Sequence, residues 1–150
     1  LKARYAAQMS GMPALADDSG LEVDALGGAP GIYSARYAGS SLKGPSKDAA
    51  NSAQLIADLA HTPLAKRTAR FQCVLVYMRH AKDPTPLICQ ASWEGMIMEN
   101  GQGEHGFGYD PIFQVLEKDR RAAQLTPTEK IAISHRGKAL AKLKRALAET

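Results

Sequence analysis

Alternating and continuous apolar positions predict the strands of this chain. Residues 71–78 are apolar at every position except Gln72, which is typical of a central strand buried on both faces and predicts a strand within residues 68–79. The turn residues 83–86 and the apolar segment 87–98 predict that the chain returns as an antiparallel hairpin, with Gly95 at a bulge or bend. Shorter strands are expected at residues 12–16, 21–25 and 109–115, with the polar residues 17–20 at a junction between the first two.

Apolar residues three and four positions apart predict the helices. One helix is expected to begin at Ser46 as its cap and to end before Pro63. A second begins at the Thr-Pro-Thr-Glu sequence of residues 126–129, which has the pattern of a capping box. Residues 33–37 are expected to form one irregular helical turn, and residues 118–121 a charged turn. The helix after Ser46 has an apolar face formed by Leu55, Ile56 and Leu59. A final helix is expected with an apolar face of Leu140, Leu143 and Leu147.

These elements favour an α/β fold in which helices flank a mixed sheet. The chain has 150 residues, 45% of them apolar and 23% charged, enough for one domain over residues 1–150 with a buried core. Residues 1–8 resemble the interior of a helix without a capping residue and without an initiator Met, so we expect a fragment of a longer domain. Glycine and proline gather in residues 27–45 and 101–111, which predicts two long, shaped loops.

Composition and cysteine placement favour a cytoplasmic protein. Apolar runs stay well below the ~18 residues that a membrane span requires. Cys73 and Cys89 would not sit opposite one another on the predicted hairpin, so we expect two reduced, buried thiols and no disulfide.

Positive charge gathers near the end of the chain. The net charge is +4, and residues 130–145 carry six basic side chains and no acid. Such a segment suits a phosphate-bearing partner, and it also fits a solvated helix face. Both interpretations stay open at this point.

Common nucleotide motifs are excluded by their context. Residues 101–106 match G-x-G-x-x-G, but Pro111 follows too soon for the helix that a dinucleotide site requires. Residues 27–31 are not followed by the Gly-Lys-Ser/Thr of a phosphate loop. The sequence also lacks zinc-ligand spacing and the G-x-S-x-G pattern of acyl-transfer enzymes.

Two groups of polar residues remain as candidates for chemistry. Asp17 and Asp18 could hold Mg²⁺ against a phosphate or take a proton from water, or they could form an ordinary Asx-turn. Lys130, His135 and Arg136 could together grip anionic or carbonyl oxygens, although a lone His135 would more often be a structural cap.

Three segments together resemble the signature blocks of the Ham1 family, the inosine/xanthosine triphosphate pyrophosphatases. They are residues 16–39 (ADDSGLEVDALGGAPGIYSARYAG), residues 106–111 (GFGYDP) and residues 125–138 (LTPTEKIAISHRGK). The resemblance extends over essentially the whole chain and is closest to the bacterial branch. It implies an elongated α/β fold with a central nucleotide-binding cleft, a homodimer, and Mg²⁺-dependent hydrolysis of ITP, dITP and XTP to the monophosphate and pyrophosphate.

The resemblance also implies roles for individual residues. Asp18 matches the general base and metal-associated carboxylate, and Asp17 is expected beside it, as a further metal-associated group or one that holds Asp18 or a metal-bound water. Lys2 matches the last basic residue of the family's N-terminal region and is expected to bind substrate. The remaining substrate contacts would be Ser19, Phe107, Gly108, Tyr109, Asp110, Lys130, His135 and Arg136.

Elementary chemistry agrees with several of these roles. Phe107 lies between two glycines, so a purine could approach its ring closely. Lys130 offers a mobile charge for triphosphate oxygens. We expect His135 and Arg136 to donate hydrogen bonds to the 6-oxo group of the base, where adenine carries a donor instead.

The first segment of family members has no counterpart in this sequence. Family members begin with a strand, a Thr/Ser-x-x-Asn-x-x-Lys phosphate loop and an acidic metal ligand, which come before the helix that here begins at Leu1. We therefore expect low activity from this chain alone and an unpaired sheet edge. Two alternatives are a non-catalytic nucleotide or RNA binder that uses the basic segment with Phe107, and an inactive truncated subunit.

Overall fold

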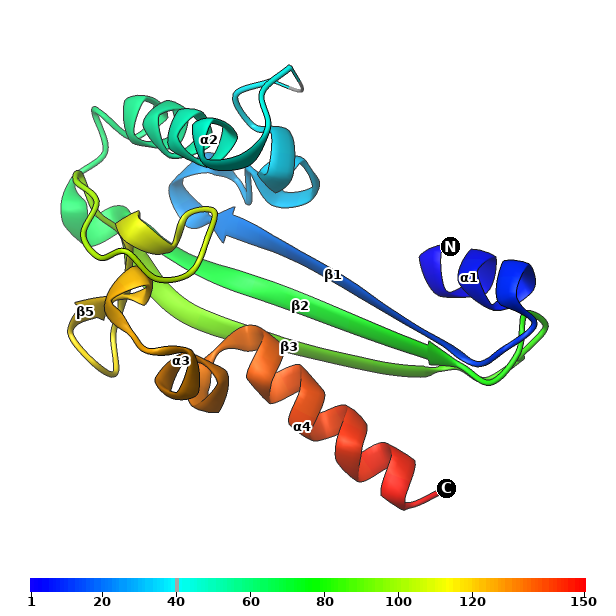
Figure 1. Ribbon diagram of the computed structural model, residues 1–150. Helices are drawn as coiled ribbons and strands as arrows, with labels where there is room; N and C mark the ends of the chain where they lie inside the picture. The colour runs from blue at the N-terminus through cyan, green and yellow to red at the C-terminus, as the bar shows by residue number, and fades with distance from the viewer. Residues whose placement is uncertain (40) are drawn as a thin grey trace.

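Three long strands form the centre of the computed structural model, which describes residues 1–39 and 41–150 (Figure 1). The sheet order is β1-β2-β3-β4-β5, and all four pairings among these strands are antiparallel. The expected α/β class with a long sheet is confirmed, whereas the expected mixture of strand directions is not found in the described residues. The strands are β1 (Ala14–Val23), β2 (Thr68–Met78), β3 (Leu87–Ile97), β4 (Phe113–Val115) and β5 (Arg120–Arg121).

The helices divide between the two ends and one face of this sheet. Helix α4 runs along β2 and β3, while α1 packs against the ends of β1 and β2 that lie beside the β2–β3 turn. Helix α2 lies toward the opposite end of the sheet from α1, beyond the end of β1 in Figure 1. The helices are α1 (Lys2–Ser10), α2 (Gly44–Asp58), α3 (Pro127–Ile133) and α4 (His135–Ala148).

Two apolar clusters hold these layers together. The larger one surrounds Trp93 and Phe113 at the end of the sheet near α2, and both side chains are fully buried there. The smaller one lies between the sheet and α4, where Leu143 packs with Cys73 and Cys89. The two cysteines are free thiols, as expected. The larger cluster also contributes Leu21, Phe71, Tyr109 and Leu125 to the wall of a cavity at its end of the sheet, so the core directly supports the site.

Strand β1 corrects the prediction of a junction at residues 17–20. These residues continue one uninterrupted strand, and Asp17 pairs with Leu75 while Asp18 pairs with Val74. The Asx-turn interpretation of the two aspartates is therefore wrong. Polar residues inside a strand hid its continuity, because the pairing with β2 depends on contacts more than fifty residues away along the chain.

Gly95 does not form the expected bulge. It pairs in register with Ala69 on β2 and with Val115 on β4. A Cβ atom at this position would lie 2.4 Å from Cζ of Phe113. The glycine is needed because the Phe113 ring packs directly over the strand.

Several element boundaries also differ from the sequence prediction. Helix α2 begins at Gly44, with Lys43 at the cap position, rather than with Ser46 as its cap, because Pro45 suits the first turn of a helix. The expected strand over residues 109–115 is a 3₁₀ turn, Asp110–Ile112, followed by the short strand β4. Part of the predicted charged turn pairs with β4 as β5. The capping box at Thr126 is confirmed.

Candidate functional site

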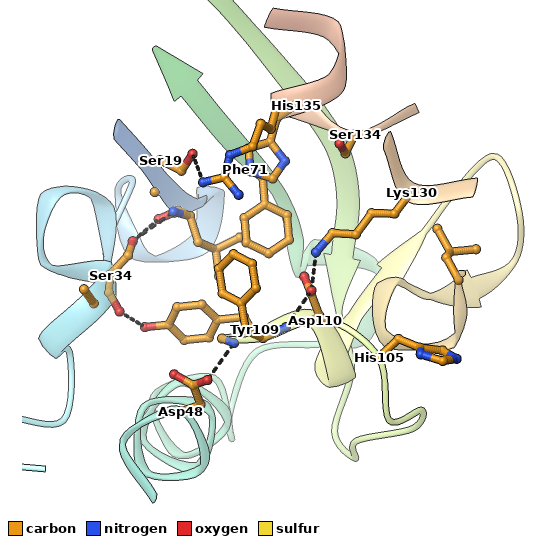
Figure 2. A pocket seen from close by; sticks show the side chains of 18 of the residues that line it. Ser19, Ser34, Asp48, Phe71, His105, Tyr109, Asp110, Lys130, Ser134 and His135 are labelled. Carbon is orange, nitrogen blue, oxygen red and sulfur yellow. Dashed lines mark hydrogen bonds and ion pairs between the residues drawn. The ribbon is translucent and has the colours of Figure 1, made fainter. Parts of the chain in front are cut away.

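A cavity of about 410 Å³ opens at the end of the sheet, where several parts of the chain meet (Figure 2). Its walls come from β1, β2 and α2, from Ser34 and Ala35, from the loop of residues 105–110, and from α3 and its junction with α4. The side chains that line it include those of Ser19, Ser34, Asp48, Phe71, Phe107, Lys130, His135 and Arg136.

The loop of residues 105–110 is shaped so that it presents the Phe107 ring. Gly106 has φ +76°, and a Cβ there would lie 2.0 Å from Oδ2 of Asp110. That absence of a side chain lets Asp110 fold back and accept a hydrogen bond from the Phe107 N–H at 3.1 Å. The Gly108 N–H donates to Oδ2 of Asp48 on α2 at 2.9 Å. The Phe107 side chain remains exposed at the cavity, and 62% of the residue is accessible.

Tyr109 and Asp110 anchor this loop from below. The Tyr109 hydroxyl donates to the backbone oxygen of Ser34 at 2.7 Å, and burial raises the pKa of Tyr109 above its usual range. Asp110 is buried and lies 2.5 Å from Nζ of Lys130. Both polar groups are therefore occupied by protein partners, so they position the loop.

Two cations flank the Phe107 ring. Nζ of Lys130 lies 4.9 Å from the ring centroid and the Arg136 guanidinium carbon lies 5.8 Å from it. Both distances are within the range of cation–π contacts. The cavity thus combines an aromatic face with hydrogen-bond donors, which suits a flat ligand that carries acceptor oxygens.

His135 lies at the start of α4 in a neutral state. Its ring stacks on Phe71, with centroids 4.9 Å apart and planes 16° from parallel. Burial, helped by the positive charges of Arg136 and Lys130, lowers the pKa of His135 to about 4. Its Nδ1 atom is buried without a hydrogen-bond partner in the described structure. A neutral imidazole beside a cavity offers one donor and one acceptor to a ligand.

A close contact between helices sets the position of His135. Ser134 ends α3 and caps α4, and it accepts a hydrogen bond from the Gly137 N–H at 3.2 Å. A Cβ on Gly137 would lie 1.7 Å from the backbone oxygen of Ile131, so the helices approach this closely because residue 137 is glycine. His135 is thus not the cap of this helix; Ser134 is.

Asp17 and Asp18 point to opposite faces of β1, as neighbouring residues of a strand do. Asp17 accepts from Nε of Arg136 at 2.7 Å and from Nη2 of the same side chain at 3.2 Å. Asp18 instead accepts from Nζ of Lys2 on α1 at 2.9 Å. The two carboxylates therefore have different partners on different helices.

A second cavity, of about 770 Å³, adjoins the first. Lys2, Asp17 and Asp18 line it, while Ser19 and Gly20 line both cavities. Ser19 and Gly20 therefore lie between the two cavities. The first contains the Phe107 ring, and the second contains the exposed side chains of Asp18 and Lys2.

Asp18 is the side chain best suited to a divalent metal. Within residues 1–39 and 41–150, no three His, Cys, Asp or Glu side chains are grouped as a metal site would require. Both oxygens of Asp17 are held by Arg136, whereas Asp18 is exposed with one lysine contact. Because Mg²⁺ is commonly held by one or two carboxylates together with substrate phosphates, Asp18 fits as a single protein ligand.

The expected site residues therefore fall into two groups. The first cavity brings together Ser19, Phe107, Gly108, Tyr109, Asp110, Lys130, His135 and Arg136. Lys2, Asp17 and Asp18 lie in the second. Of the basic segment 130–145, Lys130 and Arg136 line the first cavity, whereas Lys138 and Lys142 donate to backbone oxygens of β3. The basic segment is therefore not one continuous patch.

Sequence reasoning missed the contribution of α2. Asp48 holds Gly108, and the buried Asn51 accepts from the Ala38 N–H at 2.7 Å and so holds the preceding loop. The sequence contains one signal for this role, because Asn51 lies four residues before Leu55 and so on the helix face expected to be apolar.

Comparisons with known proteins identify the family of this chain. The model of the Ham1 family matches residues 1–146. This chain belongs to the Ham1 family. A dITP/XTP pyrophosphatase of Photobacterium profundum is 58% identical over 147 residues, which cover 98% of this chain and 73% of that protein. A dITP/XTP pyrophosphatase of Shewanella oneidensis is 60% identical over 149 residues, covering 99% of this chain and 70% of that protein.

Solved structures of Ham1 proteins have the same fold. The Ham1 protein of Coxiella burnetii superimposes with a TM-score of 0.91 at 48% identity, over 99% of this chain and 74% of that one. The Ham1 protein of Staphylococcus aureus gives a TM-score of 0.89 at 42% identity, over 99% of this chain and 73% of that one. The chain thus spans about three quarters of the length of these two Ham1 structures.

Among the residues that the structure describes, no helix combines the length and the apolar character needed to cross a membrane.

Proposed function

We propose that this Ham1 protein hydrolyses ITP, dITP and XTP to the nucleoside monophosphate and pyrophosphate. The observation that carries the proposal is the connection of two cavities through Ser19 and Gly20, one with the Phe107 ring and one with the Asp18 carboxylate. A nucleotide requires these two environments, an aromatic surface for its base and charged groups for its phosphates. The relatives named dITP/XTP pyrophosphatase support the choice of substrate.

The first cavity is proposed to bind the base. Phe107 stacks on the purine, and the small residues on either side of it leave room for a flat ring. His135 is neutral and can donate one hydrogen bond, and Arg136 supplies further N–H groups. These donors match a 6-oxo purine, whereas the exocyclic amine of adenine would leave them unpaired and so be disfavoured.

The second cavity is proposed to hold the phosphates. Lys2 supplies positive charge, and Mg²⁺ would be held by Asp18 and phosphate oxygens and would supply neutralising charge. Asp18 orients a water molecule and takes its proton as that water attacks the α phosphorus, so the bond to the bridging oxygen breaks and pyrophosphate leaves. Lys130 is paired with Asp110 beside Phe107, so we place its charge at the base end of the nucleotide.

Further parts of the proposal concern assembly and location. A homodimer follows from the family resemblance alone. A cytoplasmic location agrees with the two free cysteines. The alternative of an RNA binder is less well supported, because Lys138 and Lys142 donate to strand oxygens instead of forming a continuous basic surface with Lys130.

Pyrophosphate release from dITP, measured with and without Mg²⁺, tests the proposal. We expect release that depends on Mg²⁺ and that is far slower with dATP. Asp18→Asn should lower kcat by at least about 100-fold if Asp18 is the general base, because positioned proton transfer contributes roughly 10²–10⁴-fold. Asp24→Asn is a suitable control, since Asp24 lines neither cavity. Normal turnover by Asp18→Asn at saturating Mg²⁺ would refute the assignment.

A further inference from the structure

We infer that Asp17 is a positioning residue that fixes the Arg136 guanidinium for recognition of the base, and that it is not a metal ligand. The inference rests on the proposed function, because it assigns a role within the same nucleotide site. It separates two adjacent aspartates into different tasks, with Asp18 at the phosphates and Asp17 acting through Arg136.

The contact between Asp17 and Arg136 is bidentate. Nε of Arg136 lies 2.7 Å from Oδ2 of Asp17, and Nη2 lies 3.2 Å from Oδ1. Ser19 supports the same arrangement, since its hydroxyl lies 3.4 Å from Oδ1 of Asp17 and 3.5 Å from Nη2 of Arg136. A planar guanidinium held along one edge by a carboxylate has a defined orientation.

Asp17 acts on the first cavity without lining it. Arg136 and Ser19 line that cavity, and the Arg136 guanidinium carbon lies 5.8 Å from the centroid of Phe107. Asp17 lines the second cavity, but both of its oxygens are engaged with Arg136. A carboxylate that already makes two charge-assisted hydrogen bonds is a poor further ligand for a metal, because the metal would have to displace the guanidinium.

Fixing Arg136 in advance favours binding of the correct base. A free arginine side chain loses rotamer entropy when it is ordered. Since Asp17 and α4 already order this side chain, a ligand with an acceptor oxygen would bind without that loss. Arg136 Nη1 makes no hydrogen bond to the described residues and is available to such an oxygen.

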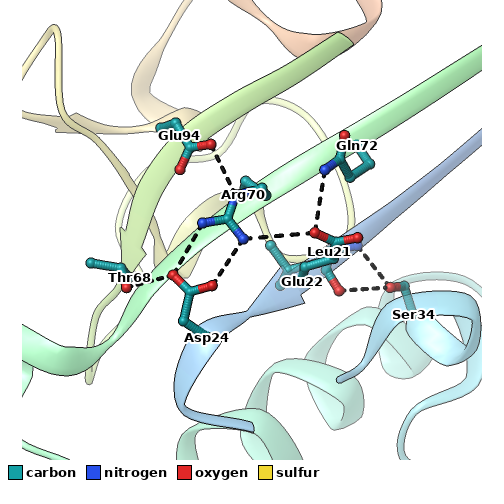
Figure 3. A network of polar contacts seen from close by, with 8 residues as sticks. All are labelled: Leu21, Glu22, Asp24, Ser34, Thr68, Arg70, Gln72 and Glu94. Atoms are coloured by element: carbon teal, nitrogen blue, oxygen red, sulfur yellow. Dashed lines mark hydrogen bonds and ion pairs between the residues drawn. The ribbon is translucent and has the colours of Figure 1, made fainter. Parts of the chain in front are cut away.

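A matched pair elsewhere in the chain provides the control. Arg70 and Asp24 also form a bidentate contact, with Nη1 2.9 Å from Oδ1 and Nη2 3.1 Å from Oδ2 (Figure 3). Neither residue lines either cavity. Asp24→Asn therefore makes the same chemical change to a similar ion pair outside the site.

The experiment measures binding separately from turnover. The dissociation constants of inosine monophosphate and adenosine monophosphate are determined by calorimetry without metal for the unaltered chain, Asp17→Asn and Asp24→Asn. We expect Asp17→Asn to weaken inosine monophosphate about tenfold and to reduce the preference over adenosine monophosphate, because one charge-assisted contact is changed. Asp24→Asn should leave that preference unchanged. An unchanged preference in Asp17→Asn would overturn the inference.

A double-mutant cycle tests whether Asp17 acts through its partner. Arg136→Lys keeps the charge but removes the planar fork. If Asp17 acts through Arg136, the double variant should bind inosine monophosphate no more weakly than Arg136→Lys alone, whereas additive losses would contradict the inference. A melting curve for each variant confirms that it is folded.

Metal dependence separates positioning from ligation. The Mg²⁺ concentration for half-maximal pyrophosphate release should stay within about twofold in Asp17→Asn, since loss of even an outer partner of a metal ligand commonly weakens metal affinity about 10- to 100-fold. A large increase in this concentration with intact base preference would show that Asp17 is a metal ligand. If the unaltered chain releases no pyrophosphate, the proposed function fails, while the binding measurements still decide the role of Asp17.

Discussion

The carboxylate of Asp48 accepts a hydrogen bond from the backbone N–H of Gly108, and 2.9 Å separates the two atoms. The residues are 60 positions apart in the chain, so the contact joins α2 directly to the loop that carries Phe107. The Tyr109 hydroxyl, in the same loop, donates a hydrogen bond to the backbone oxygen of Ser34. Helix α2 therefore fixes the position of an aromatic ring that belongs to a distant segment.

Removing the Asp48 acceptor should weaken binding of the base. Asp48→Ala leaves the Gly108 N–H without its partner, and we expect the dissociation constant of inosine monophosphate to rise about fivefold, which corresponds to ~1 kcal/mol. Asp48→Asn keeps an acceptor oxygen of similar geometry and should bind within about twofold of the unaltered protein. Equal weakening by both variants would point to the charge of Asp48 instead of its hydrogen bond.

Gly95→Ala should destabilise the protein strongly. The added methyl group would lie 2.4 Å from Cζ of Phe113 and 2.5 Å from the backbone oxygen of Gln114. We expect a loss of about 1–3 kcal/mol in the free energy of unfolding, measured in urea, because the fully buried ring must move. Gly101→Ala serves as the control, since its nearest contact would be 3.3 Å. A change of similar size in both variants would disprove the packing argument.

Stability should fall as the pH is lowered from 6.5 toward 4. The pKa of His135 is lowered from 6.5 to about 4 by burial and by the charges of Arg136 and Lys130, with Lys138 adding to this and Asp17 opposing it. Between these two pH values the unfolded chain binds the proton more readily than the folded protein does. His135 therefore removes up to about 3 kcal/mol from the free energy of unfolding across this window.

Urea unfolding at several pH values measures this effect, with His135→Gln as the comparison. The variant carries no titrating group at this position, so its stability should vary less between pH 6.5 and 4.5. The carboxyl groups of Asp24 and Asp83 have lowered pKa values, and their contributions are lost at more acidic pH. Identical pH slopes for both proteins would mean that His135 is not buried in its neutral form.

Lys138 and Lys142 should protect a free strand edge. Lys142 donates to the backbone oxygen of Gln90 at 2.6 Å and Lys138 to that of Ser92 at 3.3 Å. No other described strand pairs with this edge of β3 before Gly95. Replacing both lysines with Ala should promote self-association, seen by light scattering as a larger mean mass. The same change at Lys144 and Arg145 lowers the charge equally but should leave the mass unchanged.

Local sequence patterns predicted the elements whose formation depends on nearby residues. The hairpin of β2 and β3 and the capping box at Thr126 agree with the structure, because alternation and capping act over a few residues. The continuity of β1 was missed, since ten registered pairs with β2 override the turn character of Asp17–Gly20. Gly95 was misassigned for the same reason, because its requirement comes from a ring on another strand.

The sequence by itself determined which chemical groups the site contains. The small neighbours of Phe107, the adjacent aspartates and the cluster of Lys130, His135 and Arg136 are all evident in it. Asp17 and Asp18 point to opposite faces because strand β1 continues through both of them. Only the tertiary structure decided their partners, because Arg136 lies 119 positions from Asp17 and the separate placement of α1 and α4 gives each carboxylate a different cation.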